Sequence, residues 1–92
     1  MEMPRVLETV LLREEGGEAF ALEIDSGEVF ALNGTAAQIL HLCQQGQNIP
    51  QITAALLAGL TEPTPAEVVQ QDVEETLQTF VELGLCTFAP LA

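Results

Sequence analysis

The side chains that most often carry enzymatic chemistry are few in this sequence and poorly placed to act together. His41 is the sole imidazole, and Cys43 follows it by two residues, so the two would project from different sides of a helix. Ser26 follows Asp25 in a predicted turn, with no base near it in the sequence. No glycine-rich loop carries a lysine to hold a phosphate, and no carboxylate pair stands in an evident pocket. These patterns predict a protein without catalytic residues.

Metal and disulfide chemistry find equally little support. Cys43 and Cys86 are far apart in the sequence, form no CxxC pair and are accompanied by a single histidine. We therefore expect no metal site, no cofactor, and two buried thiols in a cytoplasmic protein. The N-terminal segment has an early Glu2 and no compact apolar region with a cleavage site, so we do not expect it to be a signal peptide. No apolar run reaches the roughly 18–20 residues of a membrane span.

The charge balance restricts the partners. The chain of 92 residues has 2 Lys and Arg against 14 Asp and Glu, for a net charge of −12, and no Lys or Arg follows Arg13. Binding to nucleic acid or to an anionic membrane draws on basic side chains, so we expect neither partner. Hydrophobic residues make up 48% of the sequence, which is enough for a single folded domain over residues 1–92.

Three predicted strands fill the first third of the chain, over Arg5–Glu14, Glu18–Asp25 and Glu28–Leu32. Tight turns at Gly16–Gly17 and Ser26–Gly27 separate them, which predicts an antiparallel meander. The middle strand alternates between large apolar residues on one face and small or acidic residues on the other: Phe20, Leu22 and Ile24 against Ala19, Ala21 and Glu23. One face of the meander must be covered by other elements.

Two amphipathic segments that follow the strands predict helices able to cover the sheet. The first helix is expected over Thr35–Gln45, with Asn33 or Thr35 as its N-cap. The second is expected over Pro50–Leu60, with Asn48 as its cap and proline tolerated in its first turn. With a third helix, the order of strands followed by helices predicts an α+β fold.

The third and longest helix is expected over Pro65–Leu83, ending at Gly84. Thr64 and Glu67 have the spacing of a capping box at its start. Apolar residues at helical spacing predict a core stripe of Val69, Val73, Thr76, Leu77, Phe80 and Leu83. The short apolar tail Leu85–Phe88 either pairs as a strand or packs under the sheet.

Three short motifs, in this order, match a known family. A strand end of the form G-x-hydrophobic-aromatic-x-L-N lies in Gly27–Asn33, Ala36 and Ile39 follow on the first helix, and Phe80 with Leu83–Leu85 closes the third. In these residues the sequence resembles the PqqD family over nearly the whole chain. It is also similar to the wider group of RiPP recognition elements, which bind leader peptides of ribosomally made, post-translationally modified peptides.

The resemblance implies a winged helix-turn-helix domain, with a three-stranded antiparallel sheet followed by three helices. It implies a standalone, non-enzymatic adaptor that binds the leader of a precursor peptide as a further strand on the third strand. The peptide side chains would enter a groove between that strand and the third helix. The implied partners are a leader peptidase and a cyclase in lasso peptide pathways, or a radical SAM enzyme in pyrroloquinoline quinone synthesis. The sequence leaves the pathway open.

The residues themselves fit such a site. An edge strand offers unpaired N–H and C=O groups that an extended peptide can satisfy, and Glu28–Leu32 is the candidate edge. On the third helix Val68 lies outside the inward arc, while Asp72 and Glu75 would meet Lys or Arg of a basic peptide. The predicted peptide-binding residues are Glu28, Val29, Phe30, Ala31, Leu32, Val68, Val69, Asp72, Glu75, Thr76 and Thr79.

Several alternatives stay open at this point. Phe30 and Leu32 fit a role in the core better than one in the site, Val68 fits an ordinary exposed side chain, and the acidic run on the third helix fits a solvated face. The charge-free span Val29–Thr61 predicts that the first two helices dock a partner enzyme or a second copy, or simply form a neutral surface. The competing functions are a winged-helix DNA-binding or regulatory domain and an accessory subunit of a larger enzyme.

Overall fold

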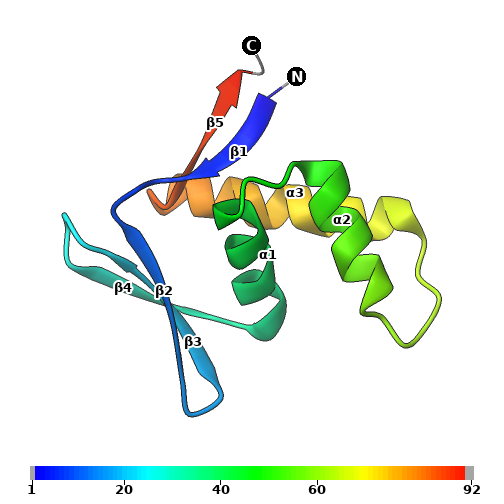
Figure 1. Ribbon diagram of the computed structural model, residues 1–92, viewed down its shortest axis with the longest axis horizontal. Helices are drawn as coiled ribbons and strands as arrows, with labels where there is room; N and C mark the ends of the chain where they lie inside the picture. The colour runs from blue at the N-terminus through cyan, green and yellow to red at the C-terminus, as the bar shows by residue number, and fades with distance from the viewer. Residues whose placement is uncertain (1, 91–92) are drawn as a thin grey trace.

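The computed structural model describes residues 2–90, and its strands form two separate antiparallel sheets (Figure 1). The smaller sheet pairs the two ends of the chain, β1 (Glu2–Val6) with β5 (Cys86–Pro90). The larger sheet is a meander of β2 (Val10–Glu15), β3 (Glu18–Glu23) and β4 (Glu28–Leu32). The three helices follow β4 and precede β5 in the sequence: α1 (Gly34–Gln44), α2 (Ile49–Ala58) and α3 (Ala66–Glu82). The expected mixed α+β fold, with a three-stranded antiparallel sheet and three helices, is confirmed.

The single strand predicted over Arg5–Glu14 is wrong, because the chain turns between β1 and β2. The amide of Leu7 donates to the carbonyl of Leu85 at 3.0 Å, and the amide of Val10 donates to the carbonyl of Leu7 at 3.1 Å. The first half of the segment therefore pairs with β5 and the second half with β3. The sequence has no glycine or proline at this turn that could have predicted it. The turn results from the pairing of β1 with the distant strand β5.

The helices cover the face of the meander that carries the small residues of β3. Ala19 and Ala21 are buried there, whereas Phe20 and Leu22 lie on the opposite face and are only half-buried. Alanine lets α1, which packs on β3, approach the sheet closely. The larger apolar side chains of β3 are thus left on the side that no helix covers.

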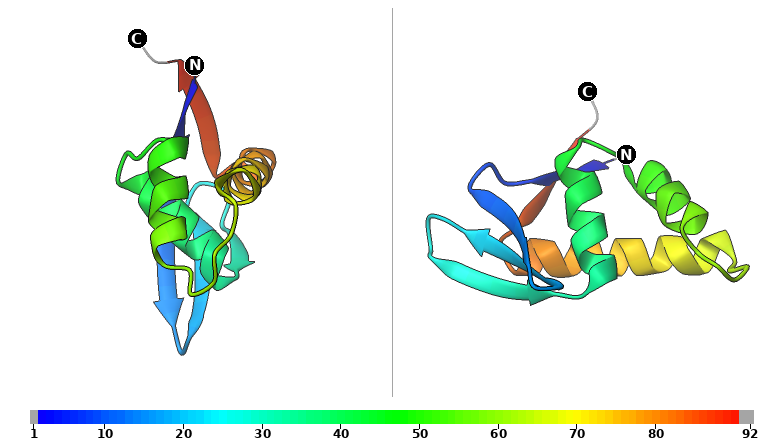
Figure 2. Two further views of the ribbon diagram at one scale, coloured as in Figure 1. Left: turned by 90° about the vertical axis from the view of Figure 1, so that its right-hand side faces the viewer. Right: turned by 60° about the horizontal axis from the view of Figure 1, so that its bottom comes forward.

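One hydrophobic core lies where the helices meet the strands. α3 packs against α2, α1 and β5, as the two views of Figure 2 also show. The largest fully buried Phe, Ile, Leu and Val side chains come from the three helices and from the residue that precedes β5: Phe80, Ile39, Leu40, Ile52, Leu77, Leu85 and Val73. Each contributes roughly 1.5–3 kcal/mol of burial free energy. Leu83, which the sequence placed in the core stripe of the third helix, is instead exposed.

The first two helices begin at side-chain caps. Asn33 rather than Thr35 caps α1, because the Asn33 Oδ1 accepts the amide of Ala36 at 2.8 Å. In α2, Asn48 and Gln51 accept from each other's backbone amides at 2.9 Å, which completes a capping box. Since Asn33 directly follows β4, the first cap fixes the angle at which the strand passes into the helix.

The third helix begins differently from the prediction. Pro65 occupies its N-cap position without a side-chain hydrogen bond, so the expected capping box of Thr64 and Glu67 is wrong. The Thr64 hydroxyl instead donates to the carbonyl of Glu62 at 3.4 Å. The other end agrees with the sequence, since Gly84 follows α3 with a φ of +79° that L-residues rarely adopt. No helix among residues 2–90 is long and apolar enough to cross a membrane.

Candidate functional site

The hydrogen-bonding phase of the meander is set by its first turn. Gly16 and Gly17 have φ values of +59° and +81°, which is the two-residue type I′ turn of a tight hairpin. The flanking residues Glu15 and Glu18 are therefore a hydrogen-bonded pair, and the pairs alternate along the ladder from there. The odd-numbered residues of β3 consequently direct their backbone groups toward β4.

This phase identifies which backbone groups of β4 are free. The β4 residues bonded to β3 are those opposite its odd-numbered positions: Glu28, Phe30 and Leu32. Val29 and Ala31 are opposite Leu22 and Phe20 in non-hydrogen-bonded pairs, so their amides and carbonyls face away from β3. Because β4 is an edge of the sheet, these groups are available to an added strand.

The side chains of β4 divide between the two faces of the sheet. Phe30 and Leu32 share the face of Ala21 and Ala19 and pack, half-buried, against the core. Val29 and Ala31 are exposed on the opposite face, and the Val29 side chain keeps 59% of its surface accessible. The backbone of β4 is thus offered at the edge while its larger side chains hold the strand to the protein.

A groove of about 440 Å³ lies between the end of β4 and α3. One wall is formed by Asn33, Thr35 and Ala36, where β4 passes into α1. The other wall is formed by α3 residues that the sequence assigned to the site: Asp72, Glu75, Thr76 and Thr79. The structure therefore brings four of the six predicted α3 residues together beside the free edge strand. Sequence reasoning missed the first wall, although its residues directly follow the predicted edge.

The remaining two predicted residues of α3 lie outside this groove. Val69 is only 7% exposed and belongs to the core, so its side chain faces the other elements instead of the groove. Val68 is 49% exposed and precedes Asp72 by one helical turn, beyond the residues that line the groove. The groove wall is therefore polar, with threonine hydroxyls and carboxylates at its surface.

The groove is acidic and offers mainly acceptors. Neither arginine lines it, and Asp72 and Glu75 supply two carboxylates. Gln71 Nε2 donates to the Glu75 Oε1 at 3.3 Å, which orients that carboxylate along the helix. The Thr79 hydroxyl donates its proton to the Glu75 backbone carbonyl at 3.0 Å, leaving its oxygen lone pairs available. Donor-rich groups such as Lys, Arg and free amides would be the chemical complement of this surface.

The turn before β4 is held by Glu23, which sequence reasoning placed only as a strand residue. Its two carboxylate oxygens accept the amides of Asp25 at 3.0 Å and Ser26 at 3.2 Å. The pKa of Glu23 lies below its ordinary value because the Thr9 hydroxyl and these turn amides donate to the carboxylate. The Ser26 Oγ accepts the amide of Glu28 at 3.2 Å, so Ser26 serves the turn.

The groups that could carry other chemistry are separated. His41 is exposed on α1, whereas Cys43 is buried on the inner side of that helix, as their spacing predicts. The pKa of the Cys86 thiol is raised well above its usual range because it is hydrogen-bonded to Cys43 and buried. Within the described part of the chain, no group of three or more His, Cys, Asp or Glu side chains is placed to hold a metal ion.

Comparison with known proteins places this geometry in context. A family model described as coenzyme PQQ synthesis protein D (PqqD) matches residues 8–85. Two solved structures share the fold: TbiB1 in complex with the TbiA(beta) leader peptide, and lasso peptide synthetase B1 complexed with the leader peptide. The first has a TM-score of 0.79 at 19% identity, covering 96% of this chain and 98% of that one. The second has a TM-score of 0.78 at 19% identity, covering 92% and 98%. Comparison with curated proteins finds no match.

Proposed function

The chain belongs to the PqqD family, and from this premise we propose that it binds the leader region of a ribosomally made precursor peptide. The observation that carries the proposal is the free edge of β4 beside a groove walled by α3. An extended peptide satisfies the unpaired backbone groups of such an edge and gains affinity from them. The two solved structures with the same fold each hold a leader peptide, which supports this assignment.

Different parts of the site give affinity for the peptide and selectivity among peptides. The free amides and carbonyls of Val29 and Ala31 pair with the peptide main chain, which any sequence can offer. Alternate peptide side chains then project toward the groove, where Asp72, Thr76 and Thr79 select among them. Leader peptides with a basic or donor-rich residue at that position are the ones this wall fits.

The proposed role is that of an adaptor without catalytic activity of its own. Bound as a strand, the leader holds the rest of the precursor close to a separate modifying enzyme and raises its effective concentration there. That enzyme is a leader peptidase or cyclase of a lasso pathway, or a radical SAM enzyme. Since precursor peptides are made on ribosomes, the adaptor acts in the cytoplasm. A homodimer through α1 and α2 stays a prediction, which light scattering tests.

We assign the arrangement to the winged helix-turn-helix class, in which β2–β4 form the wing. In DNA-binding members of that class a helix enters the major groove. The long helix of this chain carries carboxylates and no base: Glu67, Asp72, Glu74, Glu75 and Glu82. Their repulsion from phosphates favours a peptide over a duplex as the occupant.

An NMR titration tests the proposal. The ¹⁵N-labelled protein is titrated with synthetic leader peptides that carry Lys or Arg, with scrambled versions of the same peptides as controls. We expect shift changes at Val29 and Ala31 on β4 and at Thr76 and Thr79 on α3, with intermolecular contacts to β4. Shifts confined to other elements, no response to the leader, or tighter binding of duplex DNA at the same salt would contradict the assignment.

A further inference from the structure

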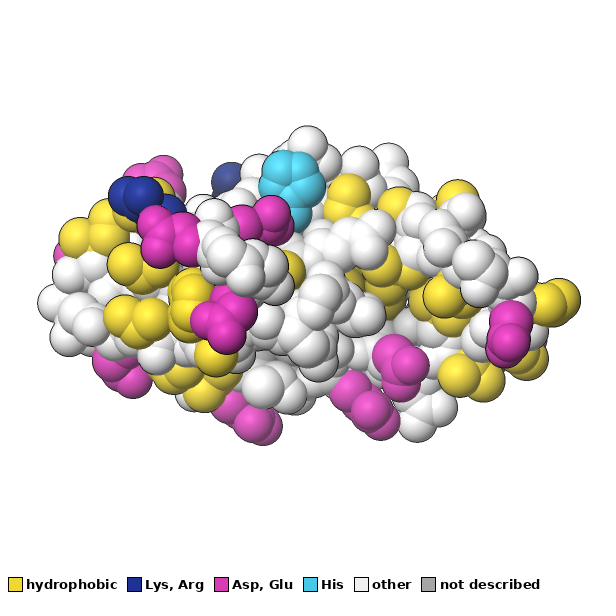
Figure 3. Space-filling view, turned by 90° about the horizontal axis from the view of Figure 1, so that it is seen from below, with side chains coloured by type: hydrophobic (Ala, Val, Ile, Leu, Met, Phe, Trp, Pro, Cys, Tyr) yellow, Lys and Arg dark blue, Asp and Glu magenta, His cyan; other side chains and the backbone are white. Residues whose placement is uncertain are grey.

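The face of the three-stranded sheet that points away from the helices is apolar across all three strands. We call it the outer sheet face. Two cross-strand rows form its centre, Leu11, Leu22 and Val29 in one and Arg13, Phe20 and Ala31 in the other, and the pair Glu15 and Glu18 forms its border. Leu11 is 41% exposed and Val29 is 59% exposed. Figure 3 shows hydrophobic side chains gathered over the meander, with basic and acidic side chains at their border.

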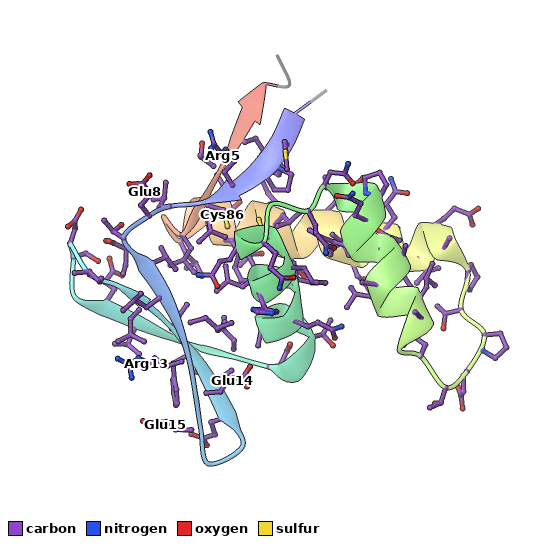
Figure 4. The ribbon with its side chains drawn as sticks, viewed as in Figure 1. Arg5, Glu8, Arg13, Glu14, Glu15 and Cys86 are labelled. Carbon is purple, nitrogen blue, oxygen red and sulfur yellow. The ribbon has the colours of Figure 1, made fainter. Side chains whose placement is uncertain are left out.

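The outer sheet face is also hollowed. A depression of about 320 Å³ is lined by Arg13, Glu15, Phe20, Leu22 and Val29. Figure 4 shows Arg13 and Glu14 on opposite sides of β2, with Arg13 on the side away from α1. The depression therefore combines an apolar floor with a guanidinium, which is one of the 2 basic side chains of the chain.

The distribution of residues on β3 runs against what burial alone favours. Alanines occupy the covered face while Phe20 and Leu22 occupy the uncovered one. A strand with a solvated face ordinarily carries polar residues there. Contiguous apolar surface of this kind marks a contact with another protein.

We propose that the outer sheet face docks the modifying enzyme and that a leader strand bound to β4 completes the docking surface. The proposal rests on the proposed function, because it places the leader on β4. Val29 and Ala31 offer their backbones to the leader and their side chains to the outer sheet face. A strand added beside them extends the same face, since alternate leader side chains project on this side.

The size of the face argues that the leader is part of the contact. Three strands of about five residues span roughly 240 Å² of flat area. A stable interface buries about 800 Å² on each partner. A fourth strand adds about 80 Å² of flat area, roughly a third more, so the loaded adaptor offers a larger apolar centre than the empty one and the surrounding surface supplies the rest of the contact. The enzyme consequently binds the loaded adaptor more tightly than the empty one, and by linkage it also tightens the leader complex.

Charge selects the enzyme over a second copy as the occupant. A homodimer through this face would bring together two chains of net charge −12, with Glu15 and Glu18 at the border of each. An enzyme surface that is apolar, with basic residues toward those glutamates and a carboxylate toward Arg13, complements the face instead. The helical surface of α1 is a poorer candidate, because Gln38, His41 and Gln44 are exposed there.

Two matched leucine variants test the inference. Leu11→Ser changes the outer sheet face two strands away from the leader edge, and Leu60→Ser changes a similarly accessible leucine two residues after α2, 47% exposed. Arg13→Gln changes an exposed position of the same face and keeps the test valid if Leu11→Ser does not fold. For each variant, calorimetry measures the affinity for the synthetic leader and the affinity of the loaded adaptor for the purified modifying enzyme encoded beside its gene.

We expect Leu11→Ser and Arg13→Gln to weaken enzyme binding by about tenfold or more while leader affinity changes by less than about twofold. Leu60→Ser should change neither affinity, and the unaltered adaptor should bind the enzyme about tenfold more tightly with leader than without. Unchanged enzyme affinity in both face variants, with normal leader binding, overturns the inference alone. A dimer of the unaltered chain that Leu11→Ser dissociates overturns it in favour of a second copy. Failure of the unaltered chain to bind leader ends the proposed function itself.

Discussion

The side-chain amide of Gln44 donates a hydrogen bond to the backbone carbonyl of Val10 at 3.4 Å and ties α1 to the edge of β2. Val10 is in a non-hydrogen-bonded pair with Glu23, so its carbonyl points outward from the sheet. The two edges of the meander therefore differ, because a helix side chain occupies part of one while the backbone of β4 stays free. This difference is the structural reason for assigning the peptide to β4.

Proline substitutions distinguish the two edges. Ala31→Pro removes an outward amide from β4, and Glu14→Pro, the matched control, removes the outward amide of an exposed residue on β2. We expect Ala31→Pro to weaken leader binding by about tenfold, the effect of losing one hydrogen bond. Fluorescence anisotropy with a labelled leader measures both, after circular dichroism has verified folding. Equal losses in the two variants, or a loss in Glu14→Pro alone, would contradict addition at β4.

The acidic wall of the groove should make leader binding depend on salt. The double variant Asp72→Asn/Glu75→Gln removes the groove carboxylates, and Glu67→Gln/Glu74→Gln removes as many charges from elsewhere on α3. For a leader with Lys or Arg at this position, we expect about three- to tenfold weaker binding in the first variant at low salt. The slope of affinity against salt should flatten in that variant only. An equal loss of leader affinity in both double variants would show that the net charge of the protein, and not the groove, attracts the leader.

How much of this could be read from the sequence differs from element to element. The alternation of side-chain types and the flanking turns predict the strand Glu28–Leu32, which is the observed range of β4. Asn48 and Gly84 lie at the helix ends where the sequence predicts them. These features are local, since a cap or a left-handed glycine is specified by a few neighbouring residues. The α3 wall was found in the same way, because Asp72 and Thr79 share a flank of one helix.

The features that escaped prediction depend on distant parts of the chain. The turn at Leu7 exists because β5 captures β1, and nothing nearby in the sequence specifies it. The buried face of β3 was not identifiable either, since it carries Ala19 and Ala21 while the larger side chains lie outside. Val69 was assigned to both the core stripe and the site, and only packing separates the two roles. Tertiary contacts thus decide what propensity leaves open.

A buried hydroxyl without a partner gives a prediction on stability. Thr53 on α2 is 6% exposed, and its Oγ1 has no hydrogen-bond partner among the described residues. Thr53→Val removes this polar atom with little change of shape, so we expect the free energy of unfolding to rise by about 1 kcal/mol. Urea titration measures the change, and Thr61→Val, at an exposed position, serves as the control. A destabilised Thr53→Val would mean that the hydroxyl does have a partner in solution.

The Glu23 carboxylate links the β3–β4 turn to pH. Because Thr9 and the turn amides lower its pKa in the folded protein, its contribution is present above the ordinary value of 4.5 and is lost as pH falls through the folded pKa. Unaltered protein and Glu23→Gln should therefore differ in urea midpoint at pH 7 and converge at more acidic pH. Asp25→Asn in the same turn is the control. A difference between the two proteins that is constant across pH would contradict this role.

The two thiols should be inert in the folded protein. Cys43 and Cys86 are 3% and 4% exposed, so a reagent in solution cannot reach either sulfur while the chain is folded. We expect Ellman's reagent to label neither at an appreciable rate until urea unfolds the chain, after which both react. Rapid labelling of the folded protein would place the pair nearer the surface than it is here.

The ribbon formed by β1 and β5 gives the molecule a handle. Its register sets Glu2 opposite Pro90, and Figure 1 shows that β1 and β5 extend away from β4. A fluorophore, affinity tag or carrier attached beyond β1 or β5 is therefore held away from the peptide-binding edge of β4. Fused to another enzyme, the domain would serve as a peptide-binding module that recruits a precursor carrying the matching leader to that enzyme.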